Sequence, residues 1–229
     1  MVLALIYDVH GNLRALRAVL DDARAAGATW FLLGGDYAAF GAEPVETLAE
    51  LRGLDDAVWI RGNWERGCAH PEQAVDTPVI KGALRAALAA LDEDTIAQQG
   101  ALPTSAVLDG TRYCHGSPRS DMDSFLPEPR DGEEELLEDV GERRIVFGHT
   151  HLQFARTTAG GVELVNPGSV GLPWNGDTRA AYAIVHDDGA IELRRVEYDV
   201  EAAATALLER YPGEEWAAAT ATRLRTAAF

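Results

Sequence analysis

The first 63 residues alternate short apolar runs with amphipathic segments. Apolar runs of strand length lie at Val2–Tyr7, Thr29–Leu33 and Ala57–Ile60. Helical spacing of apolar side chains follows Asn12, a residue type that caps helix N-termini, and recurs at Val45–Leu51. Strands that alternate with amphipathic helices are typical of βαβ units. This part of the chain is therefore predicted to form a sheet with parallel strands.

The middle of the chain changes character. Residues 65–103 have helical periodicity up to Pro103 and predict a helical cap. Ala106–Leu108 and Arg112–Cys114 flank an Asp-Gly turn and predict a strand pair. The segment Gly116–Gly132 contains three prolines and is predicted to be a loop.

The last third predicts a helix near Glu133–Val140 and a strand at Arg144–Phe147. The remainder is interpreted as antiparallel strands, including Ala181–Val185 and Ala190–Val196, followed by Ala-rich helices. The predicted fold class is therefore α/β (α+β): a four-layer αββα sandwich of two mixed sheets flanked by helices, with a small helical cap. No linker divides the chain, so residues 1–229 are expected to form one domain with the cap at about 65–103 inserted.

Composition narrows the choice of partners. With 47% hydrophobic and 25% charged residues, the 229-residue chain has the composition of a globular protein. Its 20 basic and 37 acidic residues give a net charge of −17, which disfavours duplex nucleic acid and anionic membranes and favours small ligands or proteins. The oligomeric state is not predicted.

Cellular location follows from two observations. Only Cys68 and Cys114 are present, too few for a disulfide framework. The apolar N-terminus has no basic segment before it, and no apolar run reaches transmembrane length. We therefore expect a cytoplasmic protein.

Polar side chains of metal-ligand type follow the predicted strands, and four of the six histidines are among them. In open α/β sheets ligands bind at the carboxyl ends of strands, so these positions are expected to converge. Each residue alone has an alternative: an aspartate can cap a helix, an asparagine can form a turn, and a histidine can lie in the core. The seven positions are Asp8, His10, Asp36, Asn63, His115, His149 and His151.

Asp8 and His10 are spaced i, i+2, and so are His149 and His151. On extended backbone this spacing places both side chains of a pair on one side. The order Asp-x-His, Gly-Asp, Gly-Asn, His and Gly-His-x-His resembles the calcineurin-like metallophosphoesterases. The segment Asn166–Gly171 and the stretch from Arg179 to Asp199 resemble the small bacterial phosphodiesterase branch of that family. Each motif alone is weak, but five in order form a strong signal.

The resemblance implies two divalent transition-metal ions, with Mn first and Fe, Zn, Ni or Co as alternatives. It implies that Asp36 bridges both ions and that Asp36, Asn63 and His115 take part in catalysis. One ion would be held by Asp8, His10, Asp36 and His151, and the other by Asp36, Asn63, His115 and His149.

Many family members have histidine directly after the asparagine ligand, where it is thought to protonate the leaving group. This chain has Trp64 there, and indole is not a general acid at neutral pH. Trp64 could contact a base or pack under the cap. Further candidates for substrate binding are Asn12, Arg119 and Arg179, each with a structural alternative.

The resemblance therefore implies hydrolysis of a small phosphodiester or phosphoanhydride by a metal-bridging hydroxide, with a nucleotide among the candidate substrates. Alternatives within the same class are a dinucleoside polyphosphate hydrolase and a phosphoprotein phosphatase. The alternative from another class is a non-catalytic scaffold on the same fold.

Overall fold

The computed structural model describes residues 2–228. The strands are β1 (Leu3–Ile6), β2 (Trp30–Leu33), β3 (Ala57–Trp59), β4 (Ser105–Leu108), β5 (Thr111–Cys114), β6 (Arg144–Val146), β7 (Phe154–Thr157), β8 (Glu163–Asn166), β9 (Ala180–Val185) and β10 (Ile191–Val196). The α-helices are α1 (Leu13–Ala25), α2 (Pro44–Arg52), α3 (Asn63–Ala69), α4 (Pro78–Ala90), α5 (Glu93–Gly100), α6 (Val200–Arg210) and α7 (Glu215–Thr226). Two short 3₁₀ helices are η1 (Pro71–Gln73) and η2 (Glu133–Leu137).

The strands form two five-stranded mixed sheets. The first has the order β10-β9-β1-β2-β3, with β1, β2 and β3 parallel. The second has the order β4-β5-β6-β8-β7, with β5, β6 and β8 parallel and the outer strands antiparallel. The predicted layers of two mixed sheets flanked by helices are confirmed. The prediction of only antiparallel strands near the end was wrong for β8, because β7 folds back to the edge and leaves β8 beside β6.

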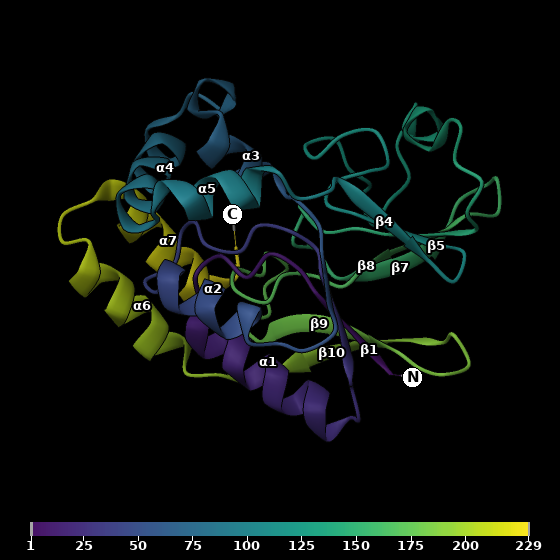
Figure 1. Ribbon diagram of the computed structural model, residues 1–229, viewed down its shortest axis with the longest axis horizontal. Helices are drawn as coiled ribbons and strands as arrows, with labels where there is room; N and C mark the ends of the chain where they lie inside the picture. Colours follow the sequence, from purple (N-terminus) through teal and green to yellow (C-terminus); the bar gives the residue numbers. More distant parts are fainter. Residues whose placement is uncertain (1, 229) are drawn as a thin grey trace.

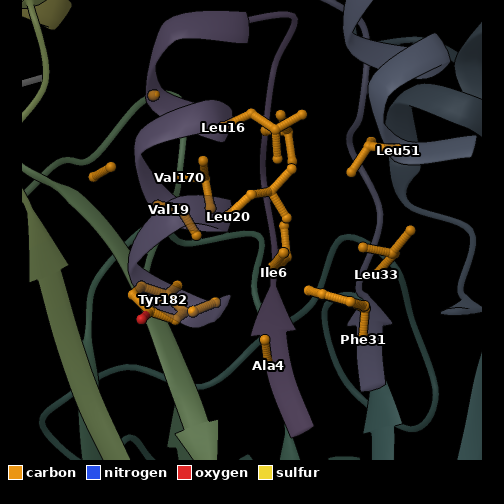
Figure 2. Packing of buried hydrophobic residues seen from close by; sticks show 14 of the residues in the cluster. Ala4, Ile6, Leu16, Val19, Leu20, Phe31, Leu33, Leu51, Val170 and Tyr182 are labelled. Atoms are coloured by element: carbon orange, nitrogen blue, oxygen red, sulfur yellow. The ribbon is translucent and has the colours of Figure 1, made fainter. Parts of the chain in front are cut away.

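Apolar side chains fill the space on both faces of the first sheet. On its inner face, Leu5 and Leu32 pack against residues of the second sheet such as Val165. Its outer face is covered by α1, whose Leu16 and Leu20 pack over Ile6, as Figure 2 shows. Complete burial of such aliphatic side chains stabilises the fold by about 1.5–3 kcal/mol each.

The outer face of the second sheet is covered differently. The loop after β5 and the helix η2 pack over it, with Phe125 fully buried. The α-helix predicted near Glu133–Val140 is instead the 3₁₀ helix η2. Gly132 precedes it with φ of 80°, and Arg156 on β7 donates hydrogen bonds to both carboxylate oxygens of Glu133. These constraints limit the segment to a short turn.

The helices of the predicted cap, α3, α4 and α5, lie together and next to α7, which in turn packs against α6 (Figure 1). α4 packs on α7, where Gly82 lies against Trp216 so closely that a Cβ atom would come within 2.4 Å of the indole. No helix in residues 2–228 is long and apolar enough to span a membrane.

Candidate metal centre

The seven candidate ligands lie at the ends of strands from both sheets. Asp8 and His10 follow β1, Asp36 follows β2, and Asn63 begins α3 after β3. His115 follows β5, and His149 and His151 follow β6. All of these strands are parallel to a neighbour in their sheet, so their carboxyl ends meet at one edge. The structure brings all seven side chains to this edge.

The backbone at five of these positions is left-handed. Asp8, His10, Asp36, His149 and His151 have φ of 54°, 50°, 59°, 66° and 58°. The sequence predicted extended backbone at the two i, i+2 pairs. This was wrong, because both pairs lie on tight turns. Left-handed backbone is uncommon for residues other than glycine and is concentrated at functional sites. Contacts in the folded protein therefore hold these residues in a backbone conformation that they do not favour on their own.

One half of the cluster gathers around Asn63. Its Oδ1 lies 2.9 Å from His115 Nε2 and 2.9 Å from His149 Nδ1. Asp36 Oδ2 lies 3.4 Å from the same His115 nitrogen. These atoms of four residues thus surround a small common space.

The other half gathers around two imidazoles. His10 Nε2 and His151 Nε2 are 3.1 Å apart, and Asp8 Oδ1 is 3.6 Å from His151 Nε2. The Nδ1 atoms of both rings lie near backbone carbonyls, those of Ala39 and Leu172. Asp36 Oδ2 is 3.8 Å from His10 Nε2, so this carboxylate lies between the two halves.

Burial sets the charge of the cluster. It lowers the pKa of His10 and, together with nearby imidazoles, the pKa of His151 and of His149, the last to about 4. At His115 burial also opposes protonation, but the carboxylates of Asp36 and Asp8 outweigh it and raise the pKa to about 10. Most of the imidazoles are therefore neutral, as metal binding requires.

The sequence model of the calcineurin-like phosphoesterase superfamily domain matches residues 1–189. The chain belongs to this superfamily. A metallophosphoesterase from Sphaerobacter thermophilus has a TM-score of 0.80 and 26% identity, with 100% of both chains covered. A hypothetical protein from Pyrococcus horikoshii OT3 has a TM-score of 0.83 and 20% identity, covering 99% of this chain and 98% of that one.

An uncharacterised protein of Methanocaldococcus jannaschii is 28% identical, and the match covers 88% of this chain and 90% of that protein. Membership of the phosphoesterase superfamily implies divalent metal ions. The groups Asp8, His10, His151 and Asp8, Asp36, His115 each bring their ligand atoms within 4.8 Å of one another.

A buried carboxylate that sequence reasoning missed supports the phosphoesterase motifs. Glu65, only 4% exposed, accepts hydrogen bonds from the backbone N–H groups of Asp36, Tyr37 and Gly62 at 2.8–2.9 Å. It thereby joins the loop after β2 to the start of α3. The signal in the sequence was its place three residues after Gly62, as in a capping box.

Replacing Glu65 tests this support. Glu65→Gln keeps the size of the side chain but directs an NH₂ group at backbone N–H donors. We expect a loss of about 1–3 kcal/mol in the free energy of unfolding and about 10–100-fold weaker metal binding, measured by chemical denaturation and metal titration. Glu72→Gln, on an exposed side chain, is the matched control. Unchanged metal affinity in Glu65→Gln would contradict this positioning role.

Glycines in the motifs allow close approaches. A Cβ atom on Gly62 would lie 2.3 Å from Asp36 Oδ1, and one on Gly171 would lie 1.8 Å from the Val9 carbonyl oxygen. Gly171 belongs to the Asn166–Gly171 segment, in which Ser169 Oγ donates to the Asp8 carbonyl at 2.8 Å. This segment therefore stabilises the turn that carries Asp8.

The four candidate substrate-binding residues have different surroundings. Asn12 is buried, caps α1 by accepting from Ala15 N–H, and donates to the Gly171 carbonyl. Trp64 is 7% exposed, its ring packs edge-on against Phe40, and its backbone N–H donates to Asp36 Oδ1.

The two arginines lie further out. Arg119 pairs with Glu138 and lines a polar cavity of about 290 Å³ that also borders His115. Arg179 pairs with Asp177 in an exposed loop and is not among the residues that line the cavity beside the ligands. That cavity, of about 550 Å³, is bordered by Asp36, Asn63 and His149 and reaches to the cap.

Three further residues of this cavity escaped sequence reasoning. Trp174 stacks on His151 with ring centroids 4.4 Å apart, and the Arg223 guanidinium lies 5.5 Å from the Trp174 ring centroid. Arg66 pairs with Asp121 through two hydrogen bonds of 2.6 and 2.9 Å. No local pattern marks these positions, because tertiary packing brings them together.

Proposed function

We propose that the protein is a dinuclear metal-dependent phosphoesterase that hydrolyses a phosphodiester or phosphoanhydride. The observation that carries this proposal is the convergence of seven side chains of metal-ligand type in one cluster, in which Asp36 Oδ2 lies 3.8 Å from His10 Nε2 and 3.4 Å from His115 Nε2. Membership of the calcineurin-like phosphoesterase superfamily supports the same reaction class.

The residues fit a pair of cations. With each Nδ1 directed at a backbone carbonyl, His10 and His151 point Nε2 lone pairs at one another across 3.1 Å. In the neutral rings there is no proton between them, so a cation would relieve the repulsion. Asp8 Oδ1 is buried and makes no hydrogen bond. A buried carboxylate oxygen of this kind is costly unless it binds something.

The proposed division of ligands assigns Asp8, His10 and His151 to one ion, Asn63, His115 and His149 to the other, and Asp36 to both. Two carboxylates among seven ligands leave the pair of cations with net positive charge, so a phosphate is attracted despite the acidic chain. When bound, two such cations neutralise phosphate charge, orient the ester and activate the attacking water. The mixed nitrogen and oxygen donors suit Mn, Fe, Zn, Ni or Co, with Mn our first choice.

The residues around the reacting phosphate offer few proton donors. Among the described residues, every histidine that lines the 550 Å³ cavity belongs to the ligand set. Trp64 lines the cavity and packs against Phe40, but its indole is not a general acid at neutral pH. His70 is exposed beside Glu72 and does not line the cavity. The departing oxygen is therefore expected to leave without a positioned side-chain acid.

This arrangement predicts a steep dependence of turnover on leaving-group acidity. General acid catalysis contributes about 10²–10⁴-fold, so its absence should penalise alkyl leaving groups far more than aryl esters or anhydrides. The measurement is kcat/KM for a series of diesters graded by leaving-group pKa. A flat dependence, with chemistry shown to be rate-limiting, would mean that another residue supplies the proton.

The proposed function itself is tested by a screen of the purified protein with and without added Mn. The substrates are phosphodiesters, phosphomonoesters, dinucleoside polyphosphates and a phosphopeptide. We expect Mn-dependent hydrolysis of diesters or anhydrides above the other classes. Preference for the phosphopeptide would favour a protein phosphatase, and bound metal without turnover of any substrate would favour a non-catalytic role.

A further inference from the structure

The cavity beside the ligands is lined by two chemically different sets of residues. One set consists of metal-ligand side chains, among them His10, Asn63 and His149. The other comes from the cap and includes Val75, Val79 and Ile80. A phosphate bound at the ligand side chains would therefore share the cavity with apolar surface.

Exposed apolar side chains gather at this cavity. In the described part of the chain, the large apolar side chains classed as exposed are Val45, Val75, Val107 and Met122. Two of these four, Val75 at 49% and Met122 at 39%, line the cavity. They come from separate segments, the start of the cap and the loop after β5. Single exposed apolar residues are ordinary, but two from separate segments in the wall of one cavity indicate a surface that a ligand covers.

The charges in the wall argue against a second anionic group. The cationic side chains in the wall, other than histidine, are Arg66 and Arg223. Arg66 is already neutralised by its two hydrogen bonds to Asp121, and Arg223 lies over the Trp174 ring. A polyphosphate chain would need several cations along its length, whereas the wall holds two arginines, one of which is already paired with Asp121. The wall instead offers hydrocarbon and aromatic surface.

From these observations, and resting on the proposed function, we infer that the substrate is a phosphodiester with one bulky apolar ester group, held in the cavity between the metal centre and the cap. A volume of about 550 Å³ is within the usual range of cavities that enclose drug-sized organic ligands. The group can be aromatic or aliphatic, since both have the shared property of burying apolar surface. The second ester group is the leaving group.

The test keeps the leaving group constant. All substrates are phosphodiesters with p-nitrophenol as the leaving group, and the other ester group, the one expected in the cavity, is methyl, ethyl, butyl, hexyl or phenyl. We expect kcat/KM to rise about fourfold for each methylene that enters the cavity, until the cavity is full. A phenyl ester that exceeds the hexyl ester would identify an aromatic group, and the reverse order an aliphatic one.

Binding gives a second readout that needs no turnover. Non-hydrolysable alkyl and phenyl phosphonates are titrated into the Mn-reconstituted protein by calorimetry. Affinity should follow the same order as kcat/KM, with a heat-capacity change that becomes more negative as the apolar group grows. This readout tests the cavity even if no diester is hydrolysed.

A pair of matched variants locates the effect. Val75→Asp places a charge in the cavity wall, and Val45→Asp makes the same change at 47% exposure on α2, outside the cavity. We expect Val75→Asp to lower kcat/KM for the hexyl and phenyl esters by about tenfold more than for the methyl ester. Val45→Asp should change none of them.

The two proposals fail in different ways. Hydrolysis of all the diesters at similar rates, with phosphonate affinities independent of size, would overturn the inference about the apolar group and leave the phosphoesterase intact. Size-dependent phosphonate binding without hydrolysis under any metal condition would support the cavity and overturn the proposed function. Equal effects of Val75→Asp and Val45→Asp would also overturn the inference.

Discussion

Asp36→Asn is expected to lower kcat on an activated diester by about 10³-fold or more and to remove both metal ions together. The reason is the place of the carboxylate, whose Oδ2 lies 3.4 Å from His115 Nε2 and 3.8 Å from His10 Nε2. Asparagine removes the negative charge shared by both groups but keeps Oδ1, which accepts the Trp64 N–H. The fold should therefore persist, and metal analysis and turnover report the loss.

A second variant separates the two groups. His151→Ala removes a ring that lies 3.1 Å from His10 Nε2 and 3.6 Å from Asp8 Oδ1. It should reduce metal content toward one ion per chain. Asp76→Asn, on an exposed side chain, is the matched control for the loss of a carboxylate charge in Asp36→Asn. Normal metal content and turnover in Asp36→Asn would show that the proposed bridging geometry is wrong.

Removal of the metals is expected to abolish turnover and to lower the melting temperature. At metal concentrations near 100 times Kd, each site adds about 2.7 kcal/mol to the free energy of unfolding. For a chain of this size that corresponds to about 5–10 °C per site. Chelation followed by scanning calorimetry measures the loss, and titration with Mn should restore turnover at two equivalents.

The same titration should depend on pH. In the metal-free protein Asp36 and Asp8 hold the pKa of His115 at about 10, against the effect of burial. Below that pH a metal must displace this proton, so affinity should fall as the pH is lowered. Recovery of full turnover without added metal, in protein shown to be metal-free by elemental analysis, would contradict the dinuclear mechanism.

The strand ends that carry the candidate ligands could be predicted because hydrophobic patterning locates strands, and polar clusters directly follow them. The Asp-x-His and Gly-His-x-His spacings marked these clusters without any knowledge of the fold. The left-handed backbone at Asp8 and His149 was not predicted. Backbone conformation at such positions is imposed by contacts with distant segments, such as the bond from His149 N–H to Asp8 Oδ2.

Features that depend on three-dimensional packing could not be predicted from the sequence. Glu65 lies in the first turn of a helix, where acidic residues are ordinary, yet it is buried and joins two loops. Trp174 and Arg223 lie on segments far apart in the chain and meet only because α7 packs near the centre. The length of η2 was also misjudged, since the pairing of Glu133 with Arg156 is a tertiary contact.

The ligands come from both sheets, and this origin bears on the order in which the protein folds. Atoms that meet in the centre are separated by 141 residues between His10 and His151 and by 86 between Asn63 and His149. Closing loops of such length is entropically costly and slow, so the centre cannot assemble until the two sheets have docked. Metal uptake as proposed would then belong to the last stage of folding. Each of the two proposed ions would be held by residues of both sheets, so their removal should weaken the attachment of one sheet to the other.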